Sequence, residues 1–403
     1  MADRSDPLKF GIFAQPFHEP GEHPTVAYER DMEVIELLDS LNFDEAWIGE
    51  HHSAGWETVG DPALFIAAAA QRTRRIRLGT GVVSLPYHHP FTVAHRMVQL
   101  DHLTRGRINF GVGPGALYSD AYQLGIEPTT QRRRMGEALD AIMRLLRGEV
   151  VTEQTEWYEL REARLQMASY QQPHVPVFVA HATSPAGAQA AGRHGVGMLS
   201  VASSELAGGL GTMAQAWTWA SDEAERHGRQ IDRRDWRVTM TMHLADSREE
   251  ALEDIREGVL ALNHGYFGTL GIRFEDGRDS VDWLAKQPGV AIGTPDDAVA
   301  AIEEVLEASG GVGGILINHR EWARTTGRMR RSYELFARHV MPRFQGQAQP
   351  FEDSLEWARE GHRTLFRPVR AAQRQAFIDA GIEVSDALRP RSRTPEPEGQ
   401  AQP

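Results

Sequence analysis

The chain has 403 residues, of which 41% are hydrophobic, and it contains no cysteine, which excludes disulfides, thiolate metal sites, iron–sulfur clusters and cysteine nucleophiles. Its formal net charge of −13 argues against a surface that binds nucleic acid or an anionic membrane. No apolar run reaches the ~18 residues of a membrane-spanning helix, and the polar, acidic residues 1–7 do not resemble a signal peptide, so we expect a cytoplasmic protein.

The first half of the chain alternates between short apolar runs, typical of buried strands, and longer stretches with helical spacing of apolar residues. Strands are predicted at 9–14, 44–49, 76–84 and 108–112, and helices at 25–41, 61–74, 92–103 and 131–146. Asp61 and Pro62 suit the start of the second helix, because an aspartate caps free N–H groups and a proline fits the first helical turn.

The same alternation continues through the second half of the chain. Strands are predicted at 177–180, 197–201, 237–244 and 314–318, and helices at 185–194, 213–227, 248–262 and 328–340. An additional helix at 295–308 precedes the last strand. Residues 265–293 have no clear periodicity and are predicted to form a loop insertion that is long enough to act as a lid.

Eight strand–helix units predict a parallel sheet with right-handed crossovers, and their span over residues 1–344 favours a closed (β/α)8 TIM barrel. An open, doubly wound sheet is the structural alternative. Residues 345–388 are predicted to form a helical C-terminal extension that packs on the barrel or on a partner subunit. Residues 389–403, rich in Pro, Glu, Gln and Arg, are expected to form a disordered tail.

In a barrel of this kind the active site lies where each strand ends and its helix begins. Histidines gather at these positions: His18, His51, His52, His89, His181, His243 and His319. We expect no metal there, because adjacent His51 and His52 would face opposite sides of a continuing strand. The only lysines, Lys9 and Lys286, suit neither a metal-bridging role nor Schiff-base chemistry. Alternatively, each histidine is only a packed, hydrogen-bonded residue.

A glycine-rich segment, Gly-Val-Gly-Pro-Gly at 111–115, follows the fourth strand. It differs from a dinucleotide-binding loop, because Pro114 lacks an N–H group and no helix is predicted directly after it. The glycines indicate either a close approach of the backbone to a planar ligand or a tight turn with positive φ.

Several separated motifs resemble the bacterial luciferase family of flavin-dependent monooxygenases. They are Trp-Ile-Gly-Glu-His-His at 47–52, Leu-Gly-Thr-Gly-Val-Val-Ser-Leu-Pro at 78–86, His-His-Pro at 88–90, Arg-Ile-Asn-Phe-Gly-Val-Gly at 107–113 and Gly-Thr-Pro at 293–295. The resemblance runs in order over residues 8–343. Within the family, the pattern is most similar to the limonene and diketocamphane monooxygenases.

The resemblance implies a role for several individual residues. His51 matches the family's catalytic histidine beside the flavin ring, and Glu50 matches a carboxylate of the flavin pocket. Gly81–Val82 falls where the family has a non-prolyl cis peptide under the isoalloxazine. Arg133 matches a phosphate-binding arginine, a role that suits a bidentate guanidinium. The other residues expected to bind the cofactor are Thr80, Gly113, His181, Ala182, Thr183 and Ser184, the last four forming a phosphate loop at a helix start.

Two positions depart from the luciferase pattern. Pro114 replaces an arginine near the phosphate, and His181 replaces a glutamate. Both departures weigh against light emission and against a long-chain aldehyde substrate. Aromatic residues near the strand ends suggest instead a small hydrophobic substrate, although packing explains each of them equally well: Phe13, Phe17, Trp56, Tyr87 and Tyr118.

The resemblance therefore implies a two-component monooxygenase. A separate NAD(P)H:flavin reductase would supply reduced FMN (FMNH2), which reacts with O2 to a C4a-(hydro)peroxyflavin that hydroxylates, epoxidises or inserts oxygen by Baeyer–Villiger chemistry. It also implies a homodimer packed through the helices at 61–74 and 92–103. The alternatives are a deazaflavin F420-dependent dehydrogenase or reductase on the same barrel, and a non-catalytic flavin-binding subunit.

Overall fold

The computed structural model describes residues 7–15, 17–182, 184–201, 209–274 and 277–383. Within these residues a parallel sheet closes on itself, because β12 pairs with β1 and β9 pairs with β10. Eight strands form the ring in this order: β1 (Lys9–Ala14), β2 (Glu45–Ile48), β3 (Arg77–Thr80), β5 (Ile108–Gly113), β8 (Val177–His181), β9 (Gly197–Val201), β10 (Trp236–Leu244) and β12 (Gly314–His319). The predicted (β/α)8 barrel is confirmed, and the open sheet is excluded.

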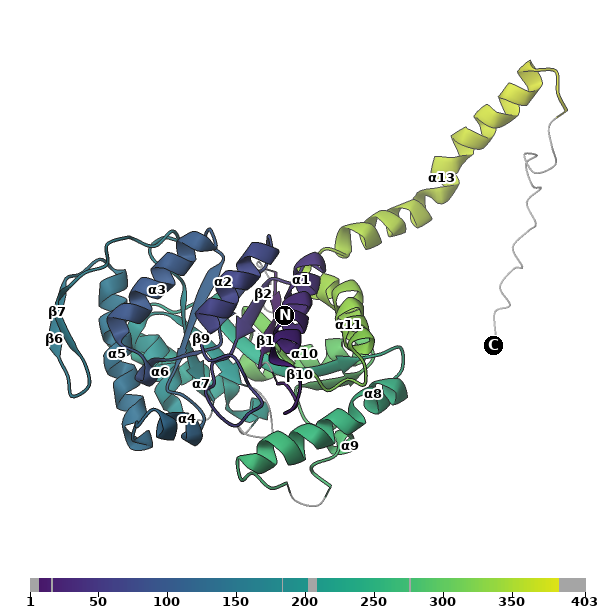
Figure 1. Cartoon of the computed structure of the whole chain (residues 1–403). Helices are drawn as coiled ribbons and strands as arrows, with labels where there is room; N and C mark the ends of the chain where they lie inside the picture. The colour runs from purple at the N-terminus through teal and green to yellow at the C-terminus, as the bar shows by residue number, and fades with distance from the viewer. Residues whose placement is uncertain (1–6, 16, 183, 202–208, 275–276, 384–403) are drawn as a thin grey trace, which may run out of the picture. The chain divides into compact units, whose positions relative to one another are not determined.

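Helices cover the outside of the ring and bury their apolar faces against the strands (Figure 1). They are α1 (Pro24–Ser40), α2 (Pro62–Arg72), α3 (Pro90–Leu103), α5 (Gln131–Leu146), α6 (Pro185–His194), α7 (Met213–Arg226), α8 (Arg248–Ala261), α10 (Pro295–Ser309) and α11 (Thr326–Leu335). Their starts follow local rules, since Asp61 accepts a hydrogen bond from the Ala63 N–H and Thr294 forms a capping box with Asp297.

The interior of the ring holds an apolar layer formed by Trp47, Phe178, Leu199 and Leu316, with Phe13 and Val82 half-buried against it. Gly79 makes room for this layer, because a Cβ there would lie 2.5 Å from the Trp47 ring. Near the amino ends of the strands, the Arg237 guanidinium donates two hydrogen bonds of 2.8 Å to the Glu45 carboxylate, and both side chains are fully buried. This ion pair joins β2 to β10.

The insertion expected to be an irregular loop is more ordered than the sequence analysis predicted. It contains a π-helical stretch (Leu262–Phe267), α9 (Val281–Leu284) and β11 (Val290–Gly293), which pairs in parallel with β10. The loop prediction at 265–293 was therefore wrong for these parts. Such short elements carry too few residues to show a period, and β11 is fixed by pairing with a distant strand rather than by its own pattern.

The structure also contains short elements that were not predicted. Among them are α4 (Tyr118–Gln123) and an antiparallel hairpin of β6 (Val151–Gln154) and β7 (Glu159–Ala163), which lies beside α5 in Figure 1. The others are the single turns Leu85–Tyr87, Pro128–Thr130, Gly209–Thr212 and Arg233–Asp235, and α12 (Met341–Gln345). Two predicted elements differ in detail, since the strand expected at 76–84 is divided into β3 and β4 (Val83–Ser84) and the helix expected at 328–340 ends in the π-helical Phe336–Val340.

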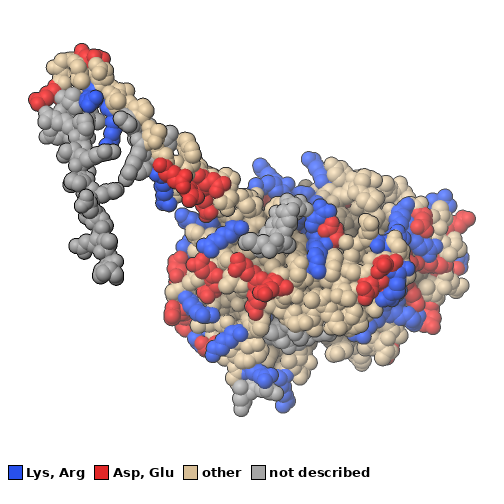
Figure 2. Space-filling view, turned by 180° about the vertical axis from the view of Figure 1, so that it is seen from behind, with Lys and Arg blue, Asp and Glu red and all other residues tan. Residues whose placement is uncertain are grey.

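The chain divides into two compact units, Met1–Gln345 and Gly346–Pro403. The second unit contains α13 (Gln349–Asp379), a 31-residue helix with Pro368 inside it. The expected tail at 389–403 lies outside the described residues. In the part of the chain that the structure covers, no helix is both long and apolar enough to cross a bilayer. Acidic and basic side chains are interspersed over the face seen in Figure 2.

Candidate active site

His51 lies in the loop that follows β2, at the carboxyl end of the barrel strands, between two buried carboxylates. Its Nδ1 is 3.0 Å from Asp120 Oδ2 on α4, and its Nε2 is 3.1 Å from Glu57 Oε2 in the loop before α2. The imidazole side chain is 14% exposed, whereas each carboxylate side chain is 1% exposed. A carboxylate accepts but does not donate, so both ring nitrogens are satisfied only when both carry a proton.

The surroundings shift the titration of this group. Burial disfavours the charged imidazolium, but the Glu57 charge and the hydrogen bond to Asp120 outweigh burial and raise the pKa of His51. Burial also tends to raise the pKa of Asp120, yet hydrogen bonds from His51 and Ser53 lower it overall. Burial raises the pKa of Glu57. The site therefore keeps a proton on His51 at a higher pH than a free imidazole would.

Glu50 organises a second, adjacent group of side chains. Its Oε1 accepts hydrogen bonds from His88 Nε2 at 2.8 Å and His52 Nε2 at 3.1 Å, and its Oε2 accepts from the Ser84 N–H at 2.9 Å. Burial opposes ionisation, but these hydrogen bonds lower the pKa of Glu50, and the bond to Glu50 raises the pKa of His52. The side chains of His51 and His52 thus contact different carboxylates.

The insertion reaches this group through Tyr266. The Tyr266 hydroxyl donates a 2.7 Å hydrogen bond to Glu57 Oε2, and its ring packs edge-on against Phe17 at 4.7 Å between centroids. Glu57 Oε1 is buried and has no hydrogen-bond partner. Trp56 also lies near Tyr266, with the ring centroids 6.4 Å apart. Contacts from the insertion therefore help to hold one of the two carboxylates that flank His51.

The glycines near the strand ends serve close packing within the protein. The Gly81–Val82 peptide is cis, as the resemblance implied. A Cβ at Gly113 would lie 2.6 Å from Val82 Cγ2, so glycine is required there for Val82 to fit. Gly115 has a φ of 86°, which identifies it as a turn residue. The Thr80 hydroxyl is buried and donates to the Gly111 carbonyl oxygen at 2.7 Å, so its polar atom is occupied.

The expected phosphate loop lies between β8 and α6. Ser184 stands directly before α6, and its side chain makes no capping hydrogen bond. Ala182 is exposed, and Thr183 falls outside the described residues. The His181 ring is buried beside Trp219, where its Nδ1 is 3.4 Å from Ser200 Oγ and its Nε2 has no hydrogen-bond partner. Burial lowers the pKa of His181 to about 4, which leaves the ring neutral.

Arg133 lies in a different environment from the one that the resemblance implied. Its side chain is exposed on α5, 3.0 Å from Glu137 Oε1 and 2.5 Å from Glu156 Oε2. To hold a phosphate it would have to leave both carboxylates. Gln131, by contrast, faces the barrel and donates to the Pro114 carbonyl oxygen at 2.9 Å.

The aromatic residues considered as substrate contacts have different surroundings. Phe13 is half-buried above the apolar layer of the ring, and burial raises the pKa of Tyr87 to about 12. Tyr118 is 80% exposed, so packing does not account for it. It borders a surface groove of about 610 Å³ next to the site, lined by Tyr118, Ser119, Tyr122, Gly125, Ile126, Glu127 and Pro128.

Sequence reasoning missed four residues of the site: Glu57, His88, Asp120 and Tyr266. His88 was recognised as part of a motif but not as a partner of Glu50. Asp120 is 69 positions from His51, and Tyr266 is 209 positions from Glu57, so no local spacing connects them. The only sequence signal for Asp120 would have been its position on α4, and that helix was not predicted.

The His51 imidazole lies between two carboxylates at the carboxyl ends of the barrel strands. This is where (β/α)8 enzymes place their active sites, and an imidazole held in this way can transfer protons. A profile described as luciferase-like monooxygenase matches residues 8–312. The chain therefore belongs to the luciferase-like monooxygenase family, and the predicted family and enzyme class are confirmed.

Two characterised relatives match over nearly their whole length. The chain is 46% identical to 4-hydroxyprotoasukamycin monooxygenase of Streptomyces nodosus subsp. asukaensis, an alignment that covers 91% of this chain and 99% of the relative. It is 44% identical to limonene 1,2-monooxygenase of Rhodococcus erythropolis, with 93% and 97% covered. Both alignments cover more of the chain than the unit Met1–Gln345 comprises, so the likeness extends into the second unit.

Solved structures share the fold. Monooxygenase RslO1 from Streptomyces bottropensis superimposes with a TM-score of 0.73 at 27% identity, covering 84% of this chain and all of that one. An F420-dependent secondary alcohol dehydrogenase superimposes with a TM-score of 0.64 at 17% identity, covering 83% of this chain and 98% of that one. At that identity the likeness concerns the fold alone, so the barrel by itself does not distinguish the two chemistries.

Proposed function

We propose that this chain is the oxygenase component of a two-component system that uses reduced FMN and O2 to oxygenate a small hydrophobic molecule. The observation that carries the proposal is the His51 imidazole, held between Glu57 and Asp120 at the mouth of a barrel that belongs to a monooxygenase family. The names of the relatives at 44–46% identity support oxygen transfer rather than dehydrogenation.

The residues at the mouth fit a bound flavin. Phe13 and Val82 provide a half-buried apolar surface above the filled interior of the ring, as a planar ring system requires. The free N–H groups at the start of α6 provide hydrogen-bond donors for a phosphate. The Ser184 hydroxyl, which makes no capping hydrogen bond, provides another. We leave Arg133 out of this phosphate site, because Glu137 and Glu156 already neutralise it.

A bound reduced flavin would supply the two electrons that place one oxygen atom of O2 in the substrate and release the other as water. His51 would hold a proton at Nε2 or Nδ1 and control its delivery to the reacting oxygen. Glu57 and Asp120 fix the imidazole plane and favour its charged form. Phe17, Trp56 and Tyr266 pack together beside Glu57 and would keep water away from His51.

We also propose a cytoplasmic homodimer that receives reduced FMN from a separate NAD(P)H:flavin reductase. Part of the chain is 30% identical to the oxygenase component of a flavin-dependent trigonelline monooxygenase from Acinetobacter baylyi, whose name implies a second component. That alignment covers 38% of this chain and 43% of the relative.

The test is reconstitution of the purified chain with a flavin reductase, NADH, FMN and O2. Limonene and a bicyclic ketone are suitable probes, because the relatives include limonene and diketocamphane monooxygenases. We expect mass-spectrometric detection of a product that is 16 Da heavier than the substrate in ordinary O2 and 18 Da heavier in 18O2. Binding of reduced FMN is measured separately under anaerobic conditions, so that a wrong probe substrate does not hide a correct cofactor.

Two results would contradict the proposal. Binding of reduced F420 but not of reduced FMN, with oxygen-independent turnover, would identify a dehydrogenase or reductase. Binding of FMN without oxygenation of any compound in a broad panel of terpenes and cyclic ketones would identify a flavin-binding subunit.

A further inference from the structure

No metal was expected at the strand-end histidines, but we infer that one of them, His319, forms with Asp31 and Glu321 a binding site for a divalent first-row transition-metal cation such as Zn²⁺. Asp31 lies on α1, His319 ends β12 and Glu321 follows two residues later. One donor atom of each residue lies within 4.8 Å of the donor atoms of the other two. Donors about 2.0–2.2 Å from one ion are at most ~4.4 Å apart, so closing this set requires only small side-chain movements.

The three side chains share one arrangement, in which one polar atom is held by a neighbour and the other polar atom is left unpaired. His319 Nδ1 is 2.7 Å from the Tyr333 hydroxyl, while its Nε2 has no hydrogen-bond partner. Asp31 Oδ2 is 3.0 Å from His18 Nε2, while its Oδ1 has no partner. His319 is 3% exposed and Asp31 is 6% exposed, so solvent does not replace the missing partners.

Glu321 has the same arrangement of one paired and one unpaired oxygen, and it is the most exposed of the three side chains. Its Oε2 is 3.2 Å from Arg30 Nε, and its unpaired Oε1 is 3.9 Å from His319 Nε2. Arg30 is the guanidinium paired with Glu321, and it also pairs with Glu22. Asp31 and Glu321 thus face His18 and Arg30, and each keeps one buried oxygen without a partner, which a bound cation would supply.

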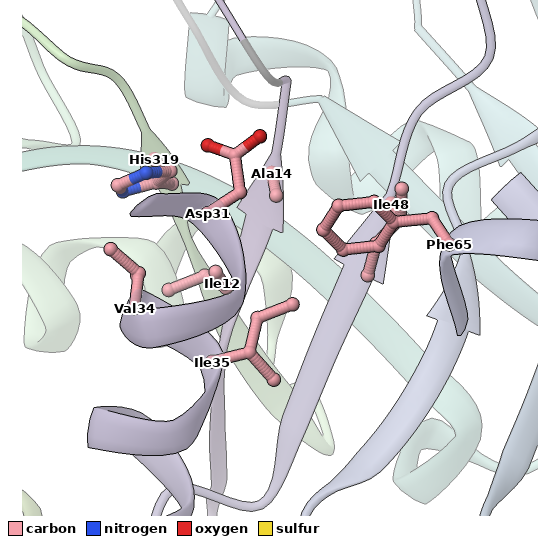
Figure 3. A pocket seen from close by; sticks show the side chains of 8 residues that line it. All are labelled: Ile12, Ala14, Asp31, Val34, Ile35, Ile48, Phe65 and His319. Carbon is pink, nitrogen blue, oxygen red and sulfur yellow. The ribbon is translucent and has the colours of Figure 1, made fainter. Parts of the chain in front are cut away.

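A cavity of about 10 Å³ adjoins the group, enough for roughly one small atom or water. Figure 3 shows Asp31 and His319 together at one end of it, with Ile12, Val34 and Ile35 nearby. An imidazole with two carboxylates suits Zn²⁺ or a similar ion better than Mg²⁺ or Ca²⁺, which prefer oxygen ligands. If His319 donates its Nδ1–H to the Tyr333 oxygen, the Nε2 lone pair is free to bind the metal.

The site would connect to the proposed active site through one loop. His18, which holds Asp31, also contacts the Thr58 hydroxyl at 3.1 Å through its Nδ1, and the Tyr28 hydroxyl donates to the Thr58 carbonyl oxygen at 2.6 Å. Thr58 directly follows Glu57, which flanks His51. The cation would therefore have a structural role: it would tie α1 and the end of β12 to the loop that carries Glu57.

The experiment uses the full-length chain without an affinity tag, dialysed against EDTA and then against metal-free buffer. Calorimetric titration with ZnCl2 should show one strong site per chain, and saturating Zn²⁺ should raise the melting temperature by roughly 3–6 °C. Glu321→Gln and Asp31→Asn should each weaken Zn²⁺ binding by at least ~10-fold. Glu334→Gln is the matched control on the exposed side of α11 and should bind Zn²⁺ like the unmodified chain.

Absence of a stoichiometric Zn²⁺ site in the unmodified chain would overturn the inference and leave an internal water as the occupant of the group. Binding that neither substitution weakens would overturn it as well, because the ion would then lie elsewhere. Glu321 is partly exposed, so its isosteric variant should remain folded, which circular dichroism checks. Neither result depends on flavin binding, so the outcome is independent of the proposed function.

Discussion

The buried ion pair between Glu45 and Arg237 gives the most quantitative prediction. Replacing Glu45 by Gln leaves the Arg237 guanidinium buried without its counter-charge and weakens the bond from Trp47 Nε1, now 2.9 Å from Glu45. Removing one partner of a buried pair typically destabilises a protein by about 3–5 kcal/mol. A second route gives a similar magnitude: burial opposes ionisation, but Arg237 lowers the pKa of Glu45 from 4.5 to about 2, which corresponds to about 3 kcal/mol.

The pH dependence has a defined sign. Because the pKa of Glu45 is lower in the folded protein, the stabilisation is complete above the unfolded pKa of 4.5 and is lost as the pH falls towards 2. Urea denaturation followed by circular dichroism should show a much lower midpoint for Glu45→Gln at pH 7, and less difference from the unmodified chain near pH 2. Replacing both Glu45 and Arg237 by Met should recover part of the loss.

The matched control is Glu29→Gln, which removes an exposed partner of Arg72 and should leave the midpoint unchanged. The reasoning would be refuted if Glu45→Gln changed the free energy of unfolding by less than about 1 kcal/mol at pH 7. It would also be refuted if the difference between the two proteins did not depend on pH.

Three further predictions concern the active site. His51→Asn should bind reduced FMN normally but lose product ~10²-fold or more, with the missing oxygen recovered as hydrogen peroxide; unchanged coupling of flavin oxidation to product would contradict it. Glu57→Gln should lower the pKa of His51, which NMR titration measures, and should move the alkaline limb of the pH–rate profile to lower pH. An alkaline limb that does not move would exclude Glu57 as the cause of the raised pKa of His51. Gly113→Ala should displace Val82 and weaken the binding of reduced FMN by roughly 10-fold. In the control Gly136→Ala the added Cβ would meet nothing within 4 Å, so this variant should bind reduced FMN as before. Equal affinities of the two variants would mean that Val82 does not support the flavin.

Much of the barrel could be predicted from the sequence because each strand–helix unit obeys local rules. Apolar runs such as 9–14 became β1 without a shift, and Asp61 caps α2 as its side-chain chemistry requires. β11 and the β6–β7 hairpin were missed, since their stability comes from pairing and packing rather than from a periodic pattern.

The residues of the active site could likewise be predicted only in part. His51 and Glu50 were identifiable because they lie just beyond a strand, where barrel chemistry is located, and because the motif at 47–52 resembles that of the family. Their partners were not, because Asp120, Glu57 and Tyr266 reach them only through the folded arrangement of α4, a loop and the insertion. The expected role of Arg133 rested on the family resemblance, and no sequence pattern indicates that Glu156 of the hairpin loop pairs with it.

The most direct test of the proposed function is an anaerobic titration of the purified chain with reduced FMN, followed by mixing with oxygenated buffer. The account predicts saturable binding of one reduced FMN per chain, and peroxide release that is slow for the unmodified protein and fast for His51→Asn. No measurable affinity for reduced FMN, or identical peroxide release from both proteins, would contradict it.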